Sequence, residues 1–216
     1  MDTQLFSGHE SSCSEFRDAF SRIMDAAPTR LETCVLSAAW INTKLGAMLS
    51  IADDAGLYLL EFIDSRGLER EIVRLRQKLK AAVIPGRTAI TEQIEQELAD
   101  YFNGVCFTFK TPIHLVGSAF QKQVWEILRQ IPLGKTRPYS EIAKILKKPT
   151  AFRAVARANG SNQLALIIPC HRVIHLNGEL GGYAGGINRK QWLLKHEEAH
   201  TRSSTKRAAR TRDIFT

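Results

Sequence analysis

The sequence predicts a small α+β subdomain with an antiparallel sheet, followed by a mainly helical domain of the winged helix-turn-helix type. Two patterns lead to this fold class. Strand-like apolar runs lie close together at 33–41, 45–51 and 57–63, with helical patterns after them. From Ser118 onward, short amphipathic helices alternate with tight breaks. The chain has 216 residues, 44% of them hydrophobic, so it can bury a core in one large domain or in two small ones.

We assign residues 33–117 to the α+β subdomain. The sequence DDAG at 53–56 joins the second and third strands as a hairpin turn. A highly charged pattern with spaced apolar residues predicts a helix at 67–80, and a second helix follows at 88–102. The run VCFTF at 105–109 predicts a further short strand.

We assign residues 118–200 to the helical domain. Its first helix, SAFQKQVWEILRQI, is amphipathic and begins at Ser118. A second helix, SEIAKILKK, is stopped by Pro149. Thr150 can cap a third helix, AFRAVARANG, which ends at Gly160.

The third helix carries Arg153 and Arg157, and three short helices with tight breaks fit a helix-turn-helix. Helix pattern alone favours an ordinary helical bundle, so the assignment depends on the charge and motifs of the same segment. A buried strand, LALIIP, a glycine-rich stretch, GGYAGG, and a final helix, NRKQWLLKHE, complete the domain.

The net charge of +8 is unevenly distributed along the chain. Residues 1–117 have 12 Lys and Arg against 16 Asp and Glu, a balance of −4, whereas residues 118–197 have 13 against 4, a balance of +9. A basic half beside an acidic half suggests a polyanionic partner, most simply nucleic acid; the plainer interpretation is solubility. The polar, basic tail at 201–216 is expected to be disordered, as a passive end or an unspecific aid to polyanion binding.

The amino terminus, MDTQLFSGHE, has neither the basic start nor the apolar stretch of a signal peptide. No apolar run approaches the ~20 residues of a membrane span. We therefore expect a cytoplasmic protein without membrane contact. The four cysteines lie far apart and form no CxxC pair, so structural zinc and a disulfide framework are both poorly supported.

The stretch LIIPCHRVI places Cys170 directly before His171. A thiol with an ordinary pKa near ~8.5 needs a neighbouring base to become a good nucleophile at neutral pH. Adjacent side chains of an extended segment point to opposite faces, so a bend or a bridging water is needed to join them. Glu197 is the carboxylate candidate to orient the histidine. The alternative is a buried, inert cysteine, which is how we interpret the other three cysteines, Cys13, Cys34 and Cys106.

This stretch resembles the active-site sequence of the O6-alkylguanine-DNA alkyltransferases, also called methylated-DNA–protein-cysteine methyltransferases. The resemblance spans about residues 118–197 and includes AFQKQVWEILRQIPLGKTRPYSEIA, RAVARANGSN, GGYAGG and RKQWLLKHE. It is closest to the carboxyl-terminal half of Ada-type adaptive-response proteins, whose α+β subdomain fits residues 33–117. The number and order of these matches argue against chance.

The family flips an O6-alkylated guanine out of duplex DNA and moves the alkyl group irreversibly to its own cysteine. Each molecule acts once, and no cofactor takes part. For this chain the resemblance implies repair of O6-methylguanine, with O4-methylthymine as an extension. It also implies a monomeric, bacterial-type protein that contacts double-stranded DNA through the minor groove.

The resemblance also implies roles for individual residues around the cysteine. Cys170 matches the alkyl acceptor, His171 takes its proton through a bridging water, and Glu197 orients the histidine. Asn162 matches the asparagine that braces the segment between recognition helix and active site. Arg172 lies within the motif and is expected to be structural.

The DNA-binding roles fall on the third helix and on the start of the second. Arg153 matches the arginine that fills the gap left by the flipped base, and Ala154 beside it is expected to contact DNA. Tyr139 matches the tyrosine that crowds the phosphate and contacts the guanine. The alternatives are a phosphate contact for Arg153 and core packing for Tyr139.

The pocket roles fall after the cysteine. Val173 matches the residue whose backbone carbonyl reads the guanine amino group, and Tyr183 matches a pocket-wall aromatic. Ala184 stands where the family often has serine, so a hydroxyl contact would be lost there while a backbone N–H contact would remain.

Three other functions compete with this interpretation. A non-catalytic lesion-binding protein would not need the intact Cys170. A transcription regulator of Ada type would need a fuller amino-terminal region. A thiol hydrolase would leave the basic half unexplained.

Residues 1–32 are expected to form a helical lead-in. GHESSCSEFRDAFSRIMDAAP resembles the end of an AraC-type helix-turn-helix, with Cys13 where serine is usual and Asp25 where glycine is usual. The first DNA-binding helices of that pattern are missing. The segment is therefore either a remnant without promoter binding or a simple amphipathic helix.

Overall fold

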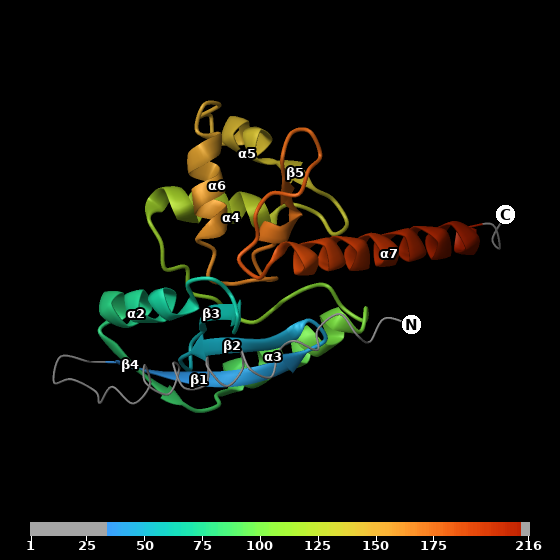
Figure 1. Ribbon diagram of the computed structural model, residues 1–216. Helices are drawn as coiled ribbons and strands as arrows, with labels where there is room; N and C mark the ends of the chain where they lie inside the picture. The colour runs from blue at the N-terminus through green and yellow to red at the C-terminus, as the bar shows by residue number, and fades with distance from the viewer. Residues whose placement is uncertain (1–33, 213–216) are drawn as a thin grey trace. The chain divides into compact units, whose positions relative to one another are not determined.

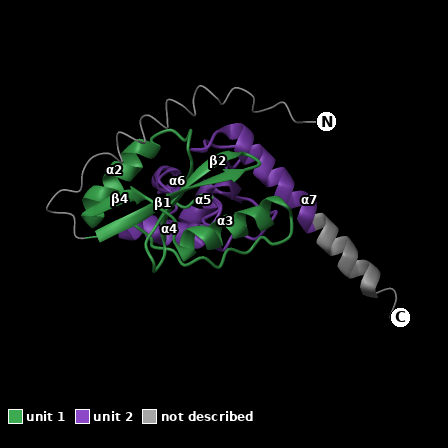
Figure 2. Cartoon of the chain, turned by 90° about the horizontal axis from the view of Figure 1, so that it is seen from below, with its two compact units in different colours: residues 1–116, 163–165 green, residues 117–162, 166–216 purple. Residues whose placement is uncertain are grey.

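The computed structural model describes residues 34–212, with side chains described through residue 201. The chain divides into two compact units, Met1–Val116 with Gln163–Ala165, and Gly117–Asn162 with Leu166–Thr216 (Figure 2). The expected amino-terminal helix within 1–32 lies outside the described residues. We describe each unit by itself.

The first unit contains a four-stranded sheet with the order β3-β2-β1-β4 (Figure 1). Its strands are β1 (Cys34–Thr43), β2 (Gly46–Ala52), β3 (Leu57–Phe62) and β4 (Ala81–Pro85). The first three form an antiparallel meander, in which Trp40 pairs with Leu49 and Met48 pairs with Phe62. Strand β4 runs parallel to β1, because the helix α2 (Leu68–Leu79) carries the chain back across the sheet. The predicted small sheet followed by a helical region is confirmed, and the sheet is mixed rather than purely antiparallel.

The predicted strand at 105–109 is wrong, and the fourth strand is β4 instead. Phe107 and Phe109 alternate as in a strand, but both rings pack on Tyr101, at centroid distances of 5.3 and 5.7 Å. The segment is therefore held by aromatic packing and not by a strand ladder. The short run of β4 was hidden in the sequence because it directly follows the helical pattern of α2.

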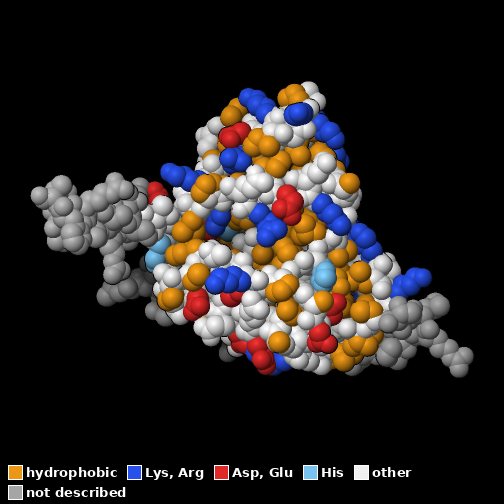
Figure 3. All heavy atoms as spheres, turned by 180° about the vertical axis from the view of Figure 1, so that it is seen from behind, with side chains coloured by type: hydrophobic (Ala, Val, Ile, Leu, Met, Phe, Trp, Pro, Cys, Tyr) orange, Lys and Arg blue, Asp and Glu red, His pale blue; other side chains and the backbone are white. Residues whose placement is uncertain are grey.

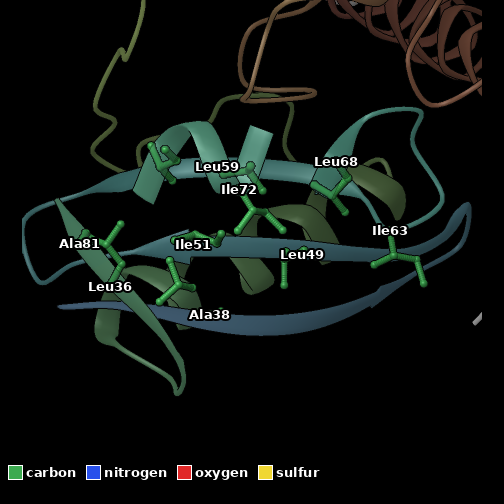
Figure 4. Close-up of a cluster of buried hydrophobic side chains, with 11 residues drawn as sticks. Leu36, Ala38, Leu49, Ile51, Leu59, Ile63, Leu68, Ile72 and Ala81 are labelled. Atoms are coloured by element: carbon green, nitrogen blue, oxygen red, sulfur yellow. The ribbon is translucent and has the colours of Figure 1, made fainter. Parts of the chain in front are cut away.

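One face of the sheet packs against α2, as the buried cluster in Figure 4 shows. Leu36 and Ile51 from the sheet meet Ile72 and Leu75 from the helix in this cluster. On alternate positions, β1 and β2 also bury side chains such as Ile41 and Met48, and helix α3 (Ala89–Phe102) contacts these two strands. Because both faces of the sheet bury side chains, the sequences of its strands are nearly continuous apolar runs.

The outer edge of β3 is paired with two short segments. Leu57 bridges to Ile113 and Leu60 bridges to Leu164, so this edge strand is paired at its start and near its middle. The buried strand predicted at LALIIP is therefore reduced to the single bridge at Leu164. Leu166 has a φ of 70°, which turns the chain away from a continued ladder.

The second unit contains four helices in its described part. They are α4 (Ala119–Arg129), α5 (Tyr139–Ile145), α6 (Phe152–Gly160) and α7 (Ile187–Arg212). Short strands β5 (Arg137–Pro138) and β6 (Val173–Ile174) pair in parallel, and a 3-10 turn, η1 (Cys170–Arg172), precedes β6. Helix α6 packs on α4 and α5, and the indole N–H of Trp125 donates to the carbonyl of Ala158 at 2.8 Å.

The predicted caps have different outcomes. Ser118 caps α4 through a reciprocal capping box with Gln121, as the sequence predicts. The predicted cap by Thr150 is wrong, because the N-cap of α6 is Ala151 and has no side-chain hydrogen bond. The amide of Ala151 donates to the carbonyl of Lys148 in a turn. Thr150 therefore lies in this turn, one residue before the N-cap position.

Helix α7 continues to Arg212, past Thr201, where the sequence predicts that order ends. The segment TKRAARTR is rich in alanine, lysine and arginine, which are good helix formers, and each added residue extends an existing helix by one hydrogen bond. No helix in the described part of the chain is long and apolar enough to cross a membrane.

Replacing Ile72 by alanine should lower the free energy of unfolding by about 2–5 kcal/mol, because it leaves a cavity between α2 and the sheet. Ile72 is fully buried, whereas its neighbour Val73 is 42% exposed. Val73→Ala is therefore the matched control and should change stability by less than about 0.5 kcal/mol. Urea unfolding followed by circular dichroism measures both, and equal losses would contradict the assigned packing.

Candidate active site

Pro169 bends the chain directly before Cys170. Its φ of −78° and ψ of 63° are those of an inverse γ-turn, and the amide of Cys170 donates to the carbonyl of Ile168 at 2.7 Å. The proline ring restricts φ to this range. Cys170 and His171 then enter the 3-10 turn η1, so they do not lie on an extended segment. The chain is therefore bent here, which is one of the two arrangements expected from the sequence; the other is a bridging water.

Asn162 holds both the turn and the thiol. Its side-chain amide donates to the carbonyl of Ile168 at 2.9 Å and to Sγ of Cys170 at 3.2 Å. Cys170 is only 7% exposed. A donor aimed at a buried sulfur favours negative charge on it. The predicted bracing contact is therefore accompanied by a direct contact with the sulfur.

His171, Arg172 and Glu197 form a buried network. Nε2 of His171 lies 2.8 Å from Oε1 of Glu197, and neither side chain is exposed. Arg172 donates to the same carboxylate through Nε at 2.8 Å and Nη2 at 2.9 Å. The third Arg172 contact is from Nη1 to the carbonyl of Ile131 at 2.6 Å, and the amide of Gly134 donates to Glu197 at 3.3 Å. One carboxylate from α7 thus holds two consecutive residues of η1.

The charges in this network set the state of the histidine. Burial alone would raise the pKa of Glu197, but His171 and Arg172 outweigh it and hold the pKa well below its usual range. Burial lowers the pKa of His171, and Arg172 and Lys190 add to this effect against the opposing influence of Glu197. Both shifts favour an ionised carboxylate beside a neutral imidazole.

The tautomer of this neutral imidazole follows from its partner. A carboxylate only accepts hydrogen bonds, so Nε2 of His171 must have the proton and donate it to Glu197. Nδ1 of His171 then has a lone pair, and this buried atom makes no hydrogen bond to the described protein groups. The ring is thus arranged to accept a proton at Nδ1.

Lys190 is a site residue that we did not predict. It is completely buried, and its ammonium donates to the carbonyl of Val173 at 2.6 Å and to that of Gly181 at 3.1 Å. Burial lowers its pKa to about 8, against the opposing effect of Cys170. The burial of Lys190 could have been predicted from helical spacing, because Lys190 shares one face of α7 with the buried Leu193 and Glu197.

The aromatic residues surround the cysteine segment. Tyr139 is buried at the start of α5, with its ring 5.6 Å from that of His175. Burial and the nearby Cys170 raise the pKa of Tyr139. The ring of Tyr183 lies 6.5 Å from that of His171, edge to face. Gly181 leaves room for Tyr139, since a Cβ there would lie 2.6 Å from the phenolic oxygen.

The remaining predicted residues lie at the surface or are half-buried. Arg153 and Ala154 are in the first turn of α6, where Arg153 is exposed and Ala154 is half-buried. Ala184 is half-buried next to Tyr183. In the described part of the chain no group of three His, Cys, Asp or Glu side chains is arranged to hold a metal ion.

Replacing Arg172 by methionine should lower the free energy of unfolding by about 3–5 kcal/mol, because it removes a bidentate partner from a buried carboxylate. Arg129→Met is the matched control, since that arginine is 43% exposed and pairs with Glu126 at the surface. The control should cost about 0–1 kcal/mol. Denaturant unfolding of both variants measures the difference, and a similar small loss in each would show that the buried pair is not a structural anchor.

Comparison with known proteins covers the part of the chain that contains this site. Residues 119–199 match the family model of the 6-O-methylguanine DNA methyltransferase DNA binding domain. A methylated-DNA–protein-cysteine methyltransferase of Salmonella typhimurium is 49% identical over 166 residues, covering 73% of this chain and 92% of the relative. Its counterpart in Methanosarcina barkeri is 40% identical over 162 residues, covering 75% and 97%.

Solved structures agree with this comparison. Mycobacterium tuberculosis OGT in complex with DNA is similar with a TM-score of 0.65 and 34% identity, covering 77% of this chain and 94% of that one. O6-methylguanine methyltransferase of the same organism has a TM-score of 0.66 and 35% identity, covering 76% and 94%. On the identity and coverage of these relatives, the chain belongs to the methylated-DNA–protein-cysteine methyltransferase family.

Proposed function

We propose that the protein repairs DNA by flipping O6-methylguanine out of the duplex and transferring the methyl group irreversibly to Cys170. The observation that carries this proposal is the arrangement at Cys170 itself. A buried sulfur receives a hydrogen bond from Asn162, and the next residue in the chain is a histidine that is oriented by Glu197. The names of the relatives, and a solved relative in complex with DNA, support the same reaction.

The transfer is a single displacement at the methyl carbon. The thiol proton passes through a bridging water to Nδ1 of His171, while Glu197 stabilises the imidazolium that forms. Sγ of Cys170 then forms a bond to the methyl carbon, and the bond from that carbon to O6 of guanine breaks with its electron pair on the base. The proton that His171 accepted passes back through water and neutralises the guanine, and S-methylcysteine remains. No group in the site can displace a thioether, so each molecule reacts once.

Burial of the cysteine requires that the base comes to the protein. A stacked base cannot reach a sulfur that is 7% exposed, so the nucleotide must leave the helix. In the proposed complex Arg153 fills the gap in the stack, and Ala154 lies against the DNA. Tyr139, Tyr183 and Ala184 line the pocket, and the carbonyl of Val173 accepts from the guanine amino group.

The DNA approach is proposed through the minor groove, with the protein acting as a monomer in the cytoplasm. The minor groove has little sequence information, which suits a protein that searches for damage in any context. The same pocket is proposed to accept O4-methylthymine, which presents an alkylated oxygen on a smaller base.

The test is to mix the protein with one equivalent of duplex DNA that contains O6-methylguanine. Mass spectrometry of the intact protein and its peptides should show one added methyl group, on Cys170, and Cys170→Ala should show none. A plateau of one methyl group per molecule in excess DNA is expected. Repeated turnover, or tight binding of the damaged DNA without label, would contradict the proposed transfer.

Lys190 is proposed as a positioning residue for this reaction. Its ammonium fixes the carbonyls of Val173 and Gly181 and places positive charge near the sulfur. Its loss should therefore weaken both the recognition of guanine and the transfer.

Lys190→Met should lower the transfer rate by roughly tenfold or more on both duplex DNA and the free base O6-benzylguanine. Because the pKa of Lys190 is lowered to about 8, the ammonium loses its charge as the pH rises through this value. The ratio of the wild-type rate to the Lys190→Met rate should therefore fall above pH about 8. A ratio that stays constant from pH ~6 to ~10 would assign the lysine a packing role only.

A further inference from the structure

Phe152 is an exposed aromatic residue at the first position of α6. Its exposure is 45%, although the helix buries Val155 and Ala158 further along. A large aromatic side chain left in water at a helix end contributes little to the core. Its position next to Arg153, on the helix that is proposed to contact DNA, calls for a different explanation.

Phe152 and Arg153 are in contact. The guanidinium carbon of Arg153 lies 5.8 Å from the centroid of the Phe152 ring, within the range of a cation–π interaction. The ring and the guanidinium therefore lie side by side at the start of the helix. Because Phe152 is exposed, the same ring is also accessible from solvent.

The surroundings of this pair favour a nucleic-acid partner. Lys147, Lys148 and Arg157 are exposed in the turn before α6 or along it. Figure 3 shows Lys and Arg side chains around hydrophobic ones over the part of the second unit that holds α5 and α6. An apolar ring within a basic surface is suited to the apolar sugar and base faces of a groove whose phosphates contact the lysines.

We propose that Phe152 is a second DNA-inserting side chain, a wedge that packs against the base step beside the flipped nucleotide while Arg153 fills the gap. The inference rests on the proposed function. Aromatic and other apolar wedges in the minor groove unstack neighbouring bases and lower the cost of distorting the duplex. On binding, the ring exchanges the guanidinium of Arg153 for a base or sugar face, and Arg153 is released into the stack.

The test compares alkyl transfer from duplex DNA with transfer from the free base O6-benzylguanine. Phe152→Ala should lower the second-order rate on the duplex by roughly tenfold and leave the free-base rate within about twofold. Phe152→Leu, which keeps an apolar group, should have a duplex rate between those of the wild type and Phe152→Ala. Ile145→Ala is the matched control, because Ile145 ends α5 with a similar exposure of 46% and should leave both rates unchanged.

A second measurement follows the DNA. 2-Aminopurine placed beside the O6-methylguanine should brighten on binding to a Cys170→Ala background, as the step unstacks, and brighten less when Phe152 is also alanine. A wild-type duplex rate in Phe152→Ala, a faster one, or an equal loss on the free base would overturn the wedge. Failure of the wild-type protein to transfer from either substrate would instead refute the proposed function, so the two failures are distinguishable.

Discussion

The site depends on one buried carboxylate. Glu197 lies on α7, far along the chain from the cysteine, yet it accepts hydrogen bonds from both His171 and Arg172. A buried carboxylate is costly unless it is fully paired, and here the pairing with Arg172 offsets that cost. The same pairing keeps the carboxylate ionised, which fixes the tautomer of the histidine. Structural anchoring and chemical preparation are therefore performed by the same atoms.

Three further contacts make the cysteine segment rigid. The γ-turn at Pro169 sets the direction of the chain, and Asn162 ties that turn to the sulfur. Lys190 fixes the carbonyl of Val173 on the other side of Cys170. A thiol held in this way cannot move toward a substrate, so preorganisation comes with the requirement that the substrate moves instead. In the proposed function, base flipping is the movement that satisfies this requirement.

The surface that is proposed to contact DNA is organised differently. Arg153 and Phe152 lie on an exposed helix start, held to each other by a ring contact and not by a buried network. Side chains that must enter a duplex need freedom to change partners, whereas side chains that prepare a nucleophile need a fixed geometry. The protein thus combines a buried hydrogen-bonded centre with an exposed pair of side chains, Phe152 and Arg153, that is proposed to change partners on DNA.

Sequence alone determined the order of most elements and the identity of the cysteine segment, because periodicity and local motifs depend on neighbouring residues. It correctly placed the three-stranded meander, the helix that begins after Ser118, and Cys170 and His171 in one segment. It predicted a strand at 105–109, but this segment packs on Tyr101 and forms no strand. It also missed β4, because a strand needs a partner strand that the local sequence pattern does not reveal.

Only the tertiary structure decided which side chains meet. Glu197 was a candidate for His171 from the sequence, but its pairing with Arg172 and the burial of Lys190 depend on α7 packing against η1. The tautomer of His171 and the lowered pKa of Lys190 follow from those contacts. Burial and long-range hydrogen bonds set the energies of charged groups, and neither is a property of the local sequence.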